Sequence, residues 1–199
     1  MRDEAERPPM PEEETRLLPE MKRYLLSRKL SYKVAKDSGW YATSKVDGYD
    51  RIVIPCTNSA GIPYYQARAI DDWTHVRYNS PPARRNDSVV LVWPKLNTLI
   101  RGTVIVEGPM DSLAAATLGY LGVGLMGNQP PEGAVEYIVS LIKGAYEPVI
   151  ILPDLDHPEM GSWMLASLAI HGITTRVRLP PRKDLAALQI WEREKLLSS

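Results

Sequence analysis

Two short acidic motifs in the second half of the chain carry residue types that suit metal-dependent chemistry. Glu107 and Asp111 lie in the sequence EGPMD, and Asp154 and Asp156 lie in the sequence DLD. Each motif directly follows an apolar run that is typical of a buried strand. Because the carboxyl ends of parallel strands open onto one crevice of an α/β sheet, we expect these side chains to converge there. Converging carboxylates predict a site for Mg²⁺, which prefers oxygen ligands.

The spacing within each motif favours a metal site over two unrelated surface turns. Gly108 lets the chain turn directly after Glu107, and Asp111 follows in the first turn of an expected helix, where a carboxylate complements the helix dipole. Asp154 and Asp156 are separated by a single residue, so an extended backbone projects both to the same side. Two carboxylates about 4–5 Å apart repel by roughly 3–4 kcal/mol at an effective dielectric constant of about 20, and a divalent cation would cancel this repulsion.

The elements that must position these motifs form an alternating pattern from Gly102 onward. Apolar runs that predict strands alternate with segments of helical spacing, and this order indicates a mostly parallel sheet with helices on its faces. We therefore expect an α/β fold in residues 102–199. The predicted strands are 103–107, 122–126, 148–153 and 174–179, and the predicted helices are about 109–120, 131–144, 159–171 and 184–197.

Residues 21–101 are typical of a smaller, strongly basic α+β subdomain. This segment has 14 basic and 6 acidic residues, a net charge of +8, whereas residues 102–199 have 7 basic and 11 acidic residues, a net charge of −4. A basic part beside an acidic part suits a protein that holds a polyanion on one and divalent metal on the other. The expected helices are 16–28 and 31–37, and the expected strands are 52–55, 62–68, 74–78 and 89–92, with a hairpin turn at 58–61.

Two further expectations concern packing in the first half of the chain. Residues 1–20 carry 3 basic and 7 acidic side chains with several prolines, a composition that predicts a mobile acidic tail. Trp40, Trp73 and Trp93 are of a type that can stack on nucleobases, but in a chain without phenylalanine we expect them to fill the core.

The composition also excludes several classes of protein. The single cysteine, Cys56, excludes a disulfide within the chain and a zinc ribbon with several cysteine ligands. The sequence has no Walker A motif, which excludes a P-loop motor in this chain. No apolar run reaches transmembrane length and the N-terminus lacks the apolar stretch of a signal peptide, so we expect a cytoplasmic protein with no membrane partner.

The acidic motifs and the elements around them resemble the TOPRIM domain of DnaG-type DNA primases. Residues 104–113 resemble the family's strand, Glu-Gly-x-x-Asp sequence and helix, and residues 154–156 resemble its Asp-x-Asp element. Residues 119–127 resemble the intervening strand with its Gly-rich turn, and residues 176–184 resemble the strand that leads to a Lys-Asp pair. The resemblance implies a basic α+β N-terminal subdomain at residues 21–101, followed by a TOPRIM domain of mostly parallel βα units at residues 102–199.

The resemblance extends upstream of the acidic motifs, which narrows the family. Residues 51–55, Gly61, residues 66–68 and residues 77–80 resemble the basic subdomain that precedes TOPRIM in primases. Small TOPRIM nucleases lack this part. The compact form, over residues 20–190, is similar to a bacteriophage primase, such as the priming half of phage primase–helicases.

The chain departs from the family pattern at several positions. Ala186 stands where a second carboxylate usually follows the equivalent of Asp184, and Arg77 stands where the family usually has lysine. Gly161 follows Asp156 by five residues, whereas the family usually has a glycine three residues after its Asp-x-Asp. The family's zinc-binding module and a helicase domain are not found in this sequence, so either a separate chain supplies them or this sequence is a fragment. We expect a replicative helicase on a separate chain.

The resemblance implies template-directed synthesis of short RNA primers on single-stranded DNA, from ribonucleoside triphosphates, during DNA replication. It implies Mg²⁺ or Mn²⁺ as cofactor and a nucleotidyl transfer reaction. The implied catalytic residues are Glu107, Asp154 and Asp156, the implied metal ligands are these three with Asp111 and Asp184, and the implied contacts to nucleic acid or nucleotide are Arg68, Arg77 and Asn79.

Two rival functions use the same residues. The same carboxylates serve TOPRIM-type nucleases that cleave a phosphodiester, although the basic upstream part argues against this reading. A single-stranded DNA-binding module without priming activity is the other alternative, and the missing carboxylate at Ala186 keeps it open.

Overall fold

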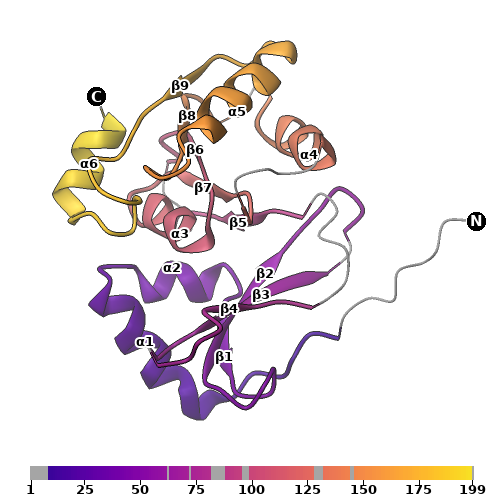
Figure 1. The fold of residues 1–199 in the computed structure, drawn as a ribbon, viewed down its shortest axis with the longest axis vertical. Coiled ribbons are helices and arrows are strands. Elements are labelled where there is room, and N and C mark those ends of the chain that lie inside the picture. The colour runs from indigo at the N-terminus through magenta and orange to yellow at the C-terminus, as the bar shows by residue number, and fades with distance from the viewer. Residues whose placement is uncertain are drawn as a thin grey trace, which may run out of the picture.

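The computed structural model describes residues 9–61, 63–71, 73–81, 88–95, 99–127, 132–143 and 146–198. Two parts lie one above the other in Figure 1, with the earlier elements below and the later elements above. Each part contains its own β-sheet. The mixed α/β class expected from the sequence is confirmed.

The first part is a four-stranded antiparallel sheet packed with two helices. Its strand order is β1-β2-β3-β4, and the long central pair β2 and β3 is joined through the hairpin turn expected at 58–61. Gly61 has a φ of +65°, a conformation that glycine adopts without a steric penalty. The elements are the 3-10 helix η1 (Thr15–Leu17), helices α1 (Leu18–Ser27) and α2 (Tyr32–Asp37), and strands β1 (Tyr41–Thr43), β2 (Arg51–Cys56), β3 (Tyr64–Ala69) and β4 (Tyr78–Asn79).

The second part is a five-stranded sheet in the order β5-β7-β6-β8-β9. Strands β7, β6, β8 and β9 are parallel, and only β5 runs antiparallel to its neighbour β7. The mostly parallel sheet expected from the alternating pattern is therefore confirmed. The elements are strands β5 (Val90–Val92), β6 (Thr103–Val106), β7 (Leu121–Gly124), β8 (Val149–Leu152) and β9 (Thr175–Val177), and helices α3 (Pro109–Thr117), α4 (Glu132–Ile142), α5 (Glu159–Ile170) and α6 (Ile190–Ser198).

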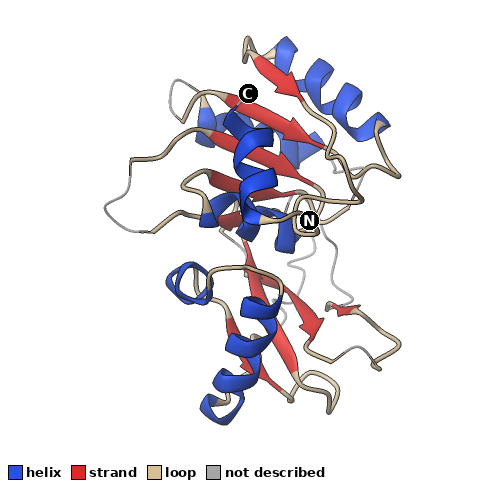
Figure 2. Ribbon diagram, turned by 90° about the vertical axis from the view of Figure 1, so that its left-hand side faces the viewer, coloured by secondary structure: helices blue, strands red, loops and turns tan. Residues whose placement is uncertain are grey.

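Alternating residues of this sheet face two different helical layers. Val104 and Val106 of β6 belong to the core that contains α3 and the end of α6, whereas Ile105 between them belongs to the core under α4 and α5. Figure 2 shows helices on both faces of this sheet. Apolar runs such as TVIV form strands here because a strand covered on both faces buries every side chain.

The core between the two parts is continuous. Trp40 of the first part is fully buried, as expected, and belongs to the same apolar cluster as Leu113 of α3 and Leu197 of α6. A hydrogen bond from the backbone N–H of Ser31 to Oγ1 of Thr117, 3.2 Å, also joins the parts. The two sheets are therefore fixed relative to one another by packing.

Several elements are shorter than the sequence indicates. The last helix begins at Ile190 and not near residue 184, because residues 184–188 form turns that supply backbone groups to the site. The expected strand at 74–78 is reduced to β4, since the backbone N–H of Thr74 donates to Oδ1 of Asp71 and closes a turn there. Trp73 in that turn is 68% exposed and Trp93 is 39% exposed, so the expectation that these two side chains fill the core is wrong.

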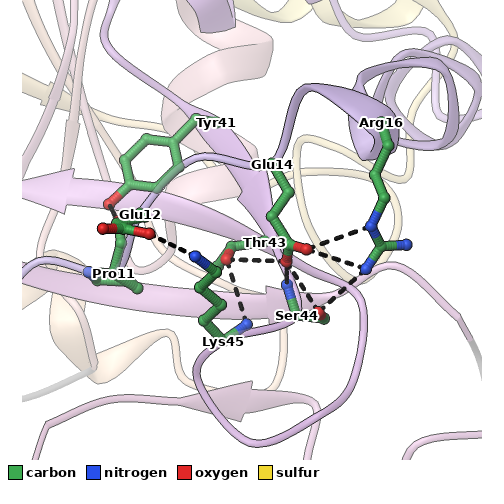
Figure 3. A network of polar contacts seen from close by, with 8 residues as sticks. All are labelled: Pro11, Glu12, Glu14, Arg16, Tyr41, Thr43, Ser44 and Lys45. Atoms are coloured by element: carbon green, nitrogen blue, oxygen red, sulfur yellow. Dashed lines mark hydrogen bonds and ion pairs between the residues drawn. The ribbon is translucent and has the colours of Figure 1, made fainter.

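The acidic N-terminal segment is attached to the first sheet from Pro11 onward, which corrects the expected mobile tail for this part of residues 1–20. Figure 3 shows Glu14 accepting hydrogen bonds from the backbone N–H and hydroxyl of Ser44, and these donors lower the pKa of Glu14 to about 2. In the same view Lys45 reaches Glu12, and the hydroxyl of Tyr41 donates to the carbonyl of Pro11. Backbone, hydroxyl and lysine donors of the residues at 41–45 thus hold the acidic segment. Residues 1–8 lie outside the described residues.

Secondary structure crosses both boundaries of the expected division into 1–20, 21–101 and 102–199. Helix α1 spans the first boundary, since it runs from Leu18 to Ser27. Strand β5 lies before the second boundary but is hydrogen-bonded to β7 of the second sheet. Its short apolar sequence fits either sheet, and only the pairing assigns it. No helix in the described part of the chain is long and apolar enough to cross a membrane.

Candidate functional site

Glu107 and Asp154 come together at the carboxyl ends of two neighbouring parallel strands. Val106, the last residue of β6, is paired with Leu152, the last residue of β8. Glu107 follows β6 directly, and its Oε1 accepts a hydrogen bond of 3.1 Å from the backbone N–H of Asp154. The convergence expected from the two apolar runs is therefore present for these two side chains.

Glycines allow helix α3 to lie close against the sheet and so place Asp111. A Cβ atom at Gly122 of β7 would lie 2.0 Å from the carbonyl oxygen of Ser112, a distance that no side chain can occupy. A Cβ atom at Gly124 would lie 3.1 Å from the carbonyl oxygen of Gly108, at the start of α3. The first turn of α3, which contains Asp111, thus lies directly beside the end of β7.

A pocket of about 350 Å³ opens at this edge of the sheet and is lined by both parts of the molecule. Its polar lining divides into an acidic wall from the second part and a basic wall that comes mostly from the first. The acidic wall consists of Glu107, Asp111, Asp154 and Asp184, and the basic wall consists of Arg28, Arg68, Arg77 and Lys183.

The carboxylates of the acidic wall disfavour one another's ionised forms. Burial, followed by the charge of Asp184, raises the pKa of Asp111 to about 8. Burial, followed by the charge of Glu107, raises the pKa of Asp154 to about 7. Burial also raises the pKa of Glu107. Raised carboxyl pKa values in one pocket are typical of a functional site, because folding stability alone does not favour them.

Backbone N–H groups of the loop before α6 orient two of these carboxylates. Oδ1 of Asp111 accepts from the N–H of Ala186 at 2.7 Å, and Oδ1 of Asp184 accepts from the N–H of Ala187 at the same distance. The loop also lies against the Asp154 segment, since the N–H of Leu155 donates to the carbonyl of Lys183. The position where a family carboxylate is replaced by Ala186 therefore contributes its backbone to the acidic wall.

Arg193 of α6 is buried directly behind this loop. Its guanidinium donates hydrogen bonds to four backbone carbonyls: those of Leu185 and Ala186 in the loop, and those of Arg28 and Lys29 in the first part. Arg193 is 1% exposed, and burial lowers its pKa. Because Arg28 and Ala186 line opposite walls, this one side chain ties the two walls of the pocket together.

Tyrosine rings hold the arginines of the basic wall. The guanidinium of Arg68 lies 4.9 Å from the ring centre of Tyr78, and its Nε donates to the hydroxyl of Tyr24 at 2.9 Å. Arg28 donates to the same hydroxyl at 3.1 Å. These contacts leave most guanidinium N–H groups of Arg68 available to a ligand with phosphate or carboxylate oxygens.

The structure brings together six of the eight site residues expected from the sequence. The two that do not line the pocket are Asp156 and Asn79. Asp156 is exposed, and it acts on the pocket through its charge, which contributes to the raised pKa of Glu107 and Asp154. The six that line the pocket are Glu107, Asp111, Asp154, Asp184, Arg68 and Arg77.

Asn79 has a structural partner instead of a place in the pocket. Its side-chain amide donates to Oδ2 of Asp47 at 2.9 Å. Asp47 also binds the buried Arg51 through two hydrogen bonds of 2.7 Å. Asn79 thus belongs to a network that fixes strands β2 and β4.

Sequence reasoning missed three residues of the site: Arg28, Lys183 and Arg193. Lys183 had a signal, because it directly precedes Asp184. Arg28 had only the general basic charge of its segment as a signal, and Arg193 in the charged sequence WEREK is typical of an exposed helix position. The hydrogen bonds of Arg193 to the backbone at Arg28 and Lys29 join residues more than 150 positions apart.

The acidic wall has the donor chemistry that Mg²⁺ or Mn²⁺ requires. All four of its side chains offer carboxylate oxygens. Burial, followed by neighbouring negative charge, raises the pKa of Asp111 and Asp154, and a cation would stabilise their ionised forms. Within the described residues, no three acidic, histidine or cysteine side chains are grouped closely enough to hold one ion together. Mg²⁺ in proteins is commonly held by one or two carboxylates and keeps several waters.

Comparison with known proteins gives a consistent result for the fold. No protein-family model and no curated protein matches the sequence. Among solved structures, the DnaG primase catalytic domain bound to ssDNA superposes with a TM-score of 0.64 and 16% identity, over 89% of this chain and 70% of that one. The primase fragment of the bacteriophage T7 primase-helicase protein superposes with a TM-score of 0.56 and 20% identity, over 87% of this chain and 70% of that one.

A third similar structure contains additional parts. The Aquifex aeolicus primase, with its zinc-binding and RNA polymerase domains, gives a TM-score of 0.63 and 17% identity over 89% of this chain, which spans 54% of that structure. The resemblance to primases drawn from short motifs is thus supported by most of the described chain. The protein has the fold of DnaG-type primase catalytic domains.

Proposed function

We propose that this chain is a DNA primase catalytic core that synthesises short RNA primers on single-stranded DNA during replication. The observation that carries the proposal is the composite pocket. Its volume is about 350 Å³, and it is lined by an acidic wall and a basic wall. Nucleotidyl transfer needs both, since negative phosphates must be held beside the carboxylates that position a metal ion. The similar fold of a DnaG primase catalytic domain bound to ssDNA supports the same conclusion.

The carboxylates would hold Mg²⁺ or Mn²⁺. Glu107 and Asp154 are the central ligands in this proposal, and Asp156, Asp111 and Asp184 support them through their charge or through a retained water. When bound, the ion would lower the pKa of the attacking 3′-hydroxyl and neutralise nucleotide phosphate oxygens. The hydrogen bond between Glu107 and the backbone of Asp154 keeps the two strand ends in register for this task.

The basic wall would bind phosphates of the template and of the incoming ribonucleoside triphosphate. Arg68 and Arg77 suit this role because a guanidinium binds phosphate through two parallel hydrogen bonds. Tyr24 and Tyr78 orient Arg68 toward the pocket, so less conformational entropy is lost on binding. Lys183, beside Asp184, adds a positive charge at the boundary of the two walls.

The biological setting follows from this activity. A replicative helicase on a separate chain would supply unwound template, and the reaction would take place in the cytoplasm, that of the host if the protein is encoded by a bacteriophage. Partners and setting rest on the proposed activity and fall with it.

The test is a primer synthesis assay with single-stranded DNA, Mg²⁺ or Mn²⁺ and labelled ribonucleotides. Template-dependent oligoribonucleotides are expected, with a loss of at least about 100-fold in the double variant Asp154→Asn/Asp156→Asn. Asp37→Asn is the matched control, since this carboxylate pairs with Lys33 on α2, outside the pocket.

The same assay separates the rival functions. Shortened DNA without new RNA would indicate a nuclease, and DNA binding without either product would indicate a binding module. Primers made equally well by the double variant would overturn the metal site.

A further inference from the structure

A second pocket of about 420 Å³ adjoins the first one on the basic wall. Arg68 and Arg77 line both pockets, so the two pockets share these two basic side chains. The remaining lining of the second pocket comes from the end of β3, at Ala69, and from the segment between β3 and β4, at Asp71, Trp73, Thr74 and His75.

Trp73 presents a large aromatic surface in this second pocket. The residue is 68% exposed, although exposing an indole is unfavourable compared with burying it. Its ring meets the ring of Tyr49 edge to face, with 5.4 Å between the ring centres. Tyr49 is itself 41% exposed, so this contact orients the indole without covering it.

The turn that carries Trp73 is built by specific hydrogen bonds. Oδ1 of Asp71 accepts hydrogen bonds from both the backbone N–H and the hydroxyl of Thr74. These bonds close the turn that contains Trp73, and they engage the carboxylate of Asp71 inside the turn. Among the described residues, the guanidinium of Arg77 makes no hydrogen bond or ion pair. An oriented aromatic face and an available cation therefore lie in the same pocket.

We propose that this pocket binds an unpaired nucleobase of single-stranded nucleic acid, stacked on Trp73, with the adjoining phosphate on Arg77. Stacking on aromatic side chains is how single-stranded nucleic acid is held without sequence preference, because every base has a π-face. Arg68 then continues the phosphate track toward the acidic wall. The path of the bound nucleic acid strand toward the acidic wall rests on the proposed function. The stacking on Trp73 does not.

The test compares nucleic acids with and without bases. Binding of fluorescein-labelled dT16 and of an abasic 16-unit deoxyribose phosphate strand is measured by anisotropy, without metal or ribonucleotides. The variant Trp73→Ala is expected to weaken dT16 binding roughly 5- to 100-fold, the range for loss of one stacked base, and to leave binding of the abasic strand unchanged. Trp73→Phe is expected to keep most of the dT16 affinity.

Trp191→Ala is the matched control. Trp191 is 66% exposed, nearly as much as Trp73, but it lies on α6 and lines a different hollow. This variant is expected to bind both strands as the unmodified chain does. Circular dichroism of all three variants checks that they fold.

Salt dependence separates stacking from phosphate contact. Arg77→Gln is expected to weaken dT16 and the abasic strand alike and to reduce the slope of log affinity against log salt by about 0.7, the value for one phosphate on a single strand. Trp73→Ala is expected to leave that slope unchanged. Equal weakening of dT16 and the abasic strand by Trp73→Ala, or no weakening of either, would overturn the proposal.

Further probes identify the source of the base and distinguish this proposal from the proposed function. Parallel titrations with rU16 and with UTP show whether the pocket prefers DNA, RNA or a free nucleotide, and a Trp73 effect on UTP alone would contradict a strand site. If the unmodified chain makes no primer but Trp73→Ala still loses dT16 affinity, the stacking site stands and priming falls. If primers form and Trp73→Ala binds dT16 normally, the priming function stands and the stacking site is overturned.

Discussion

The carboxyl group of Asp111 is buried, accepts a hydrogen bond from the backbone N–H of Ala186, and lies near the charge of Asp184. These surroundings raise its pKa to about 8. The residue therefore costs stability whenever it is ionised in the folded chain without a cation. Carboxylates whose ionised form lowers the stability of the fold are found more often in functional sites than elsewhere.

The pH dependence of stability follows from this shift. Between about pH 4 and pH 8, folded Asp111 holds a proton that the unfolded chain has released, so the folded state binds more protons than the unfolded state. Stability of the metal-free protein contributed by this group is therefore lost as pH rises through that window. We expect Asp111→Asn, which keeps the acceptor for Ala186, to stabilise the metal-free protein at pH 8 by at least about 1 kcal/mol, or about 2–4 °C in Tm.

Thermal melts in EDTA at pH 5 and pH 8 check this expectation. The gain should be larger at pH 8, and Asp37→Asn on the surface of α2 should show no such gain. Parallel pH profiles for the unmodified chain and Asp111→Asn would contradict the raised pKa.

At the scale of elements, the contact between α3 and β7 decides the position of the acidic wall. A Cβ at Gly122 would lie 2.0 Å from the carbonyl oxygen of Ser112. We expect Gly122→Ala to push α3 away from the sheet and to destabilise the fold by about 2 kcal/mol or more, as overpacking of a close contact does. Urea denaturation measures the loss.

Gly172→Ala is the control for this prediction. Gly172 has a φ of +75° but open space around its Cα, so alanine there should cost only about 1 kcal/mol of backbone strain. Equal effects of the two variants would show that the α3–β7 contact is looser than the structure indicates.

Arg193 is the second decisive feature at this scale, because α6 uses it to hold both the loop at Leu185–Ala186 and the turn at Arg28–Lys29. Arg193→Met would leave four carbonyls, two of them in buried hydrogen bonds, without this donor. We expect a loss of roughly 3–5 kcal/mol in unfolding free energy, with partial recovery in Arg193→Lys.

Chemical denaturation compares these variants with Arg176→Met on β9. Arg176 is exposed, so its replacement should change stability by no more than about 0.5 kcal/mol. A small effect of Arg193→Met would mean that the two walls do not depend on this side chain.

At the scale of the whole molecule, one apolar core passes from α1 and α2 through α3 to α6. We expect both parts to unfold in a single cooperative transition, because neither can lose its packing alone. Urea curves followed by far-UV circular dichroism and by tryptophan fluorescence, to which the buried Trp40 contributes, should coincide. Two separated transitions would show that the parts are independent domains.

Charge also acts at this scale. The basic segment 21–101 and the acidic segment 102–199 contribute opposite walls of one pocket, so a chain with zero net charge contains a strongly polarised site. The acidic N-terminal residues Glu12, Glu13 and Glu14 instead pair with nearby basic or hydroxyl groups of the first part. Placement, and not the total charge, determines which groups are available to a ligand.

Much of the fold could be predicted from the sequence, because strand and helix periodicities are local properties of the chain. The apolar runs at β6 and β8, and the carboxylates directly after them, predicted that Glu107 and Asp154 would meet. The turn at 58–61 likewise predicted the hairpin of β2 and β3. These inferences need only the geometry of regular elements and of parallel sheets.

Other features were decided by tertiary structure alone, since they depend on which distant groups meet. The pairing of β5 with β7, the exposure of Trp73 and the burial of Arg193 have no signal in local periodicity. The same holds for the hydrogen bond that makes the backbone of Ala186 part of the acidic wall. The sequence thus determined that carboxylates gather at the ends of parallel strands. Only packing between the two parts decided which basic side chains lie opposite these carboxylates. That packing depends on contacts between residues more than 100 positions apart.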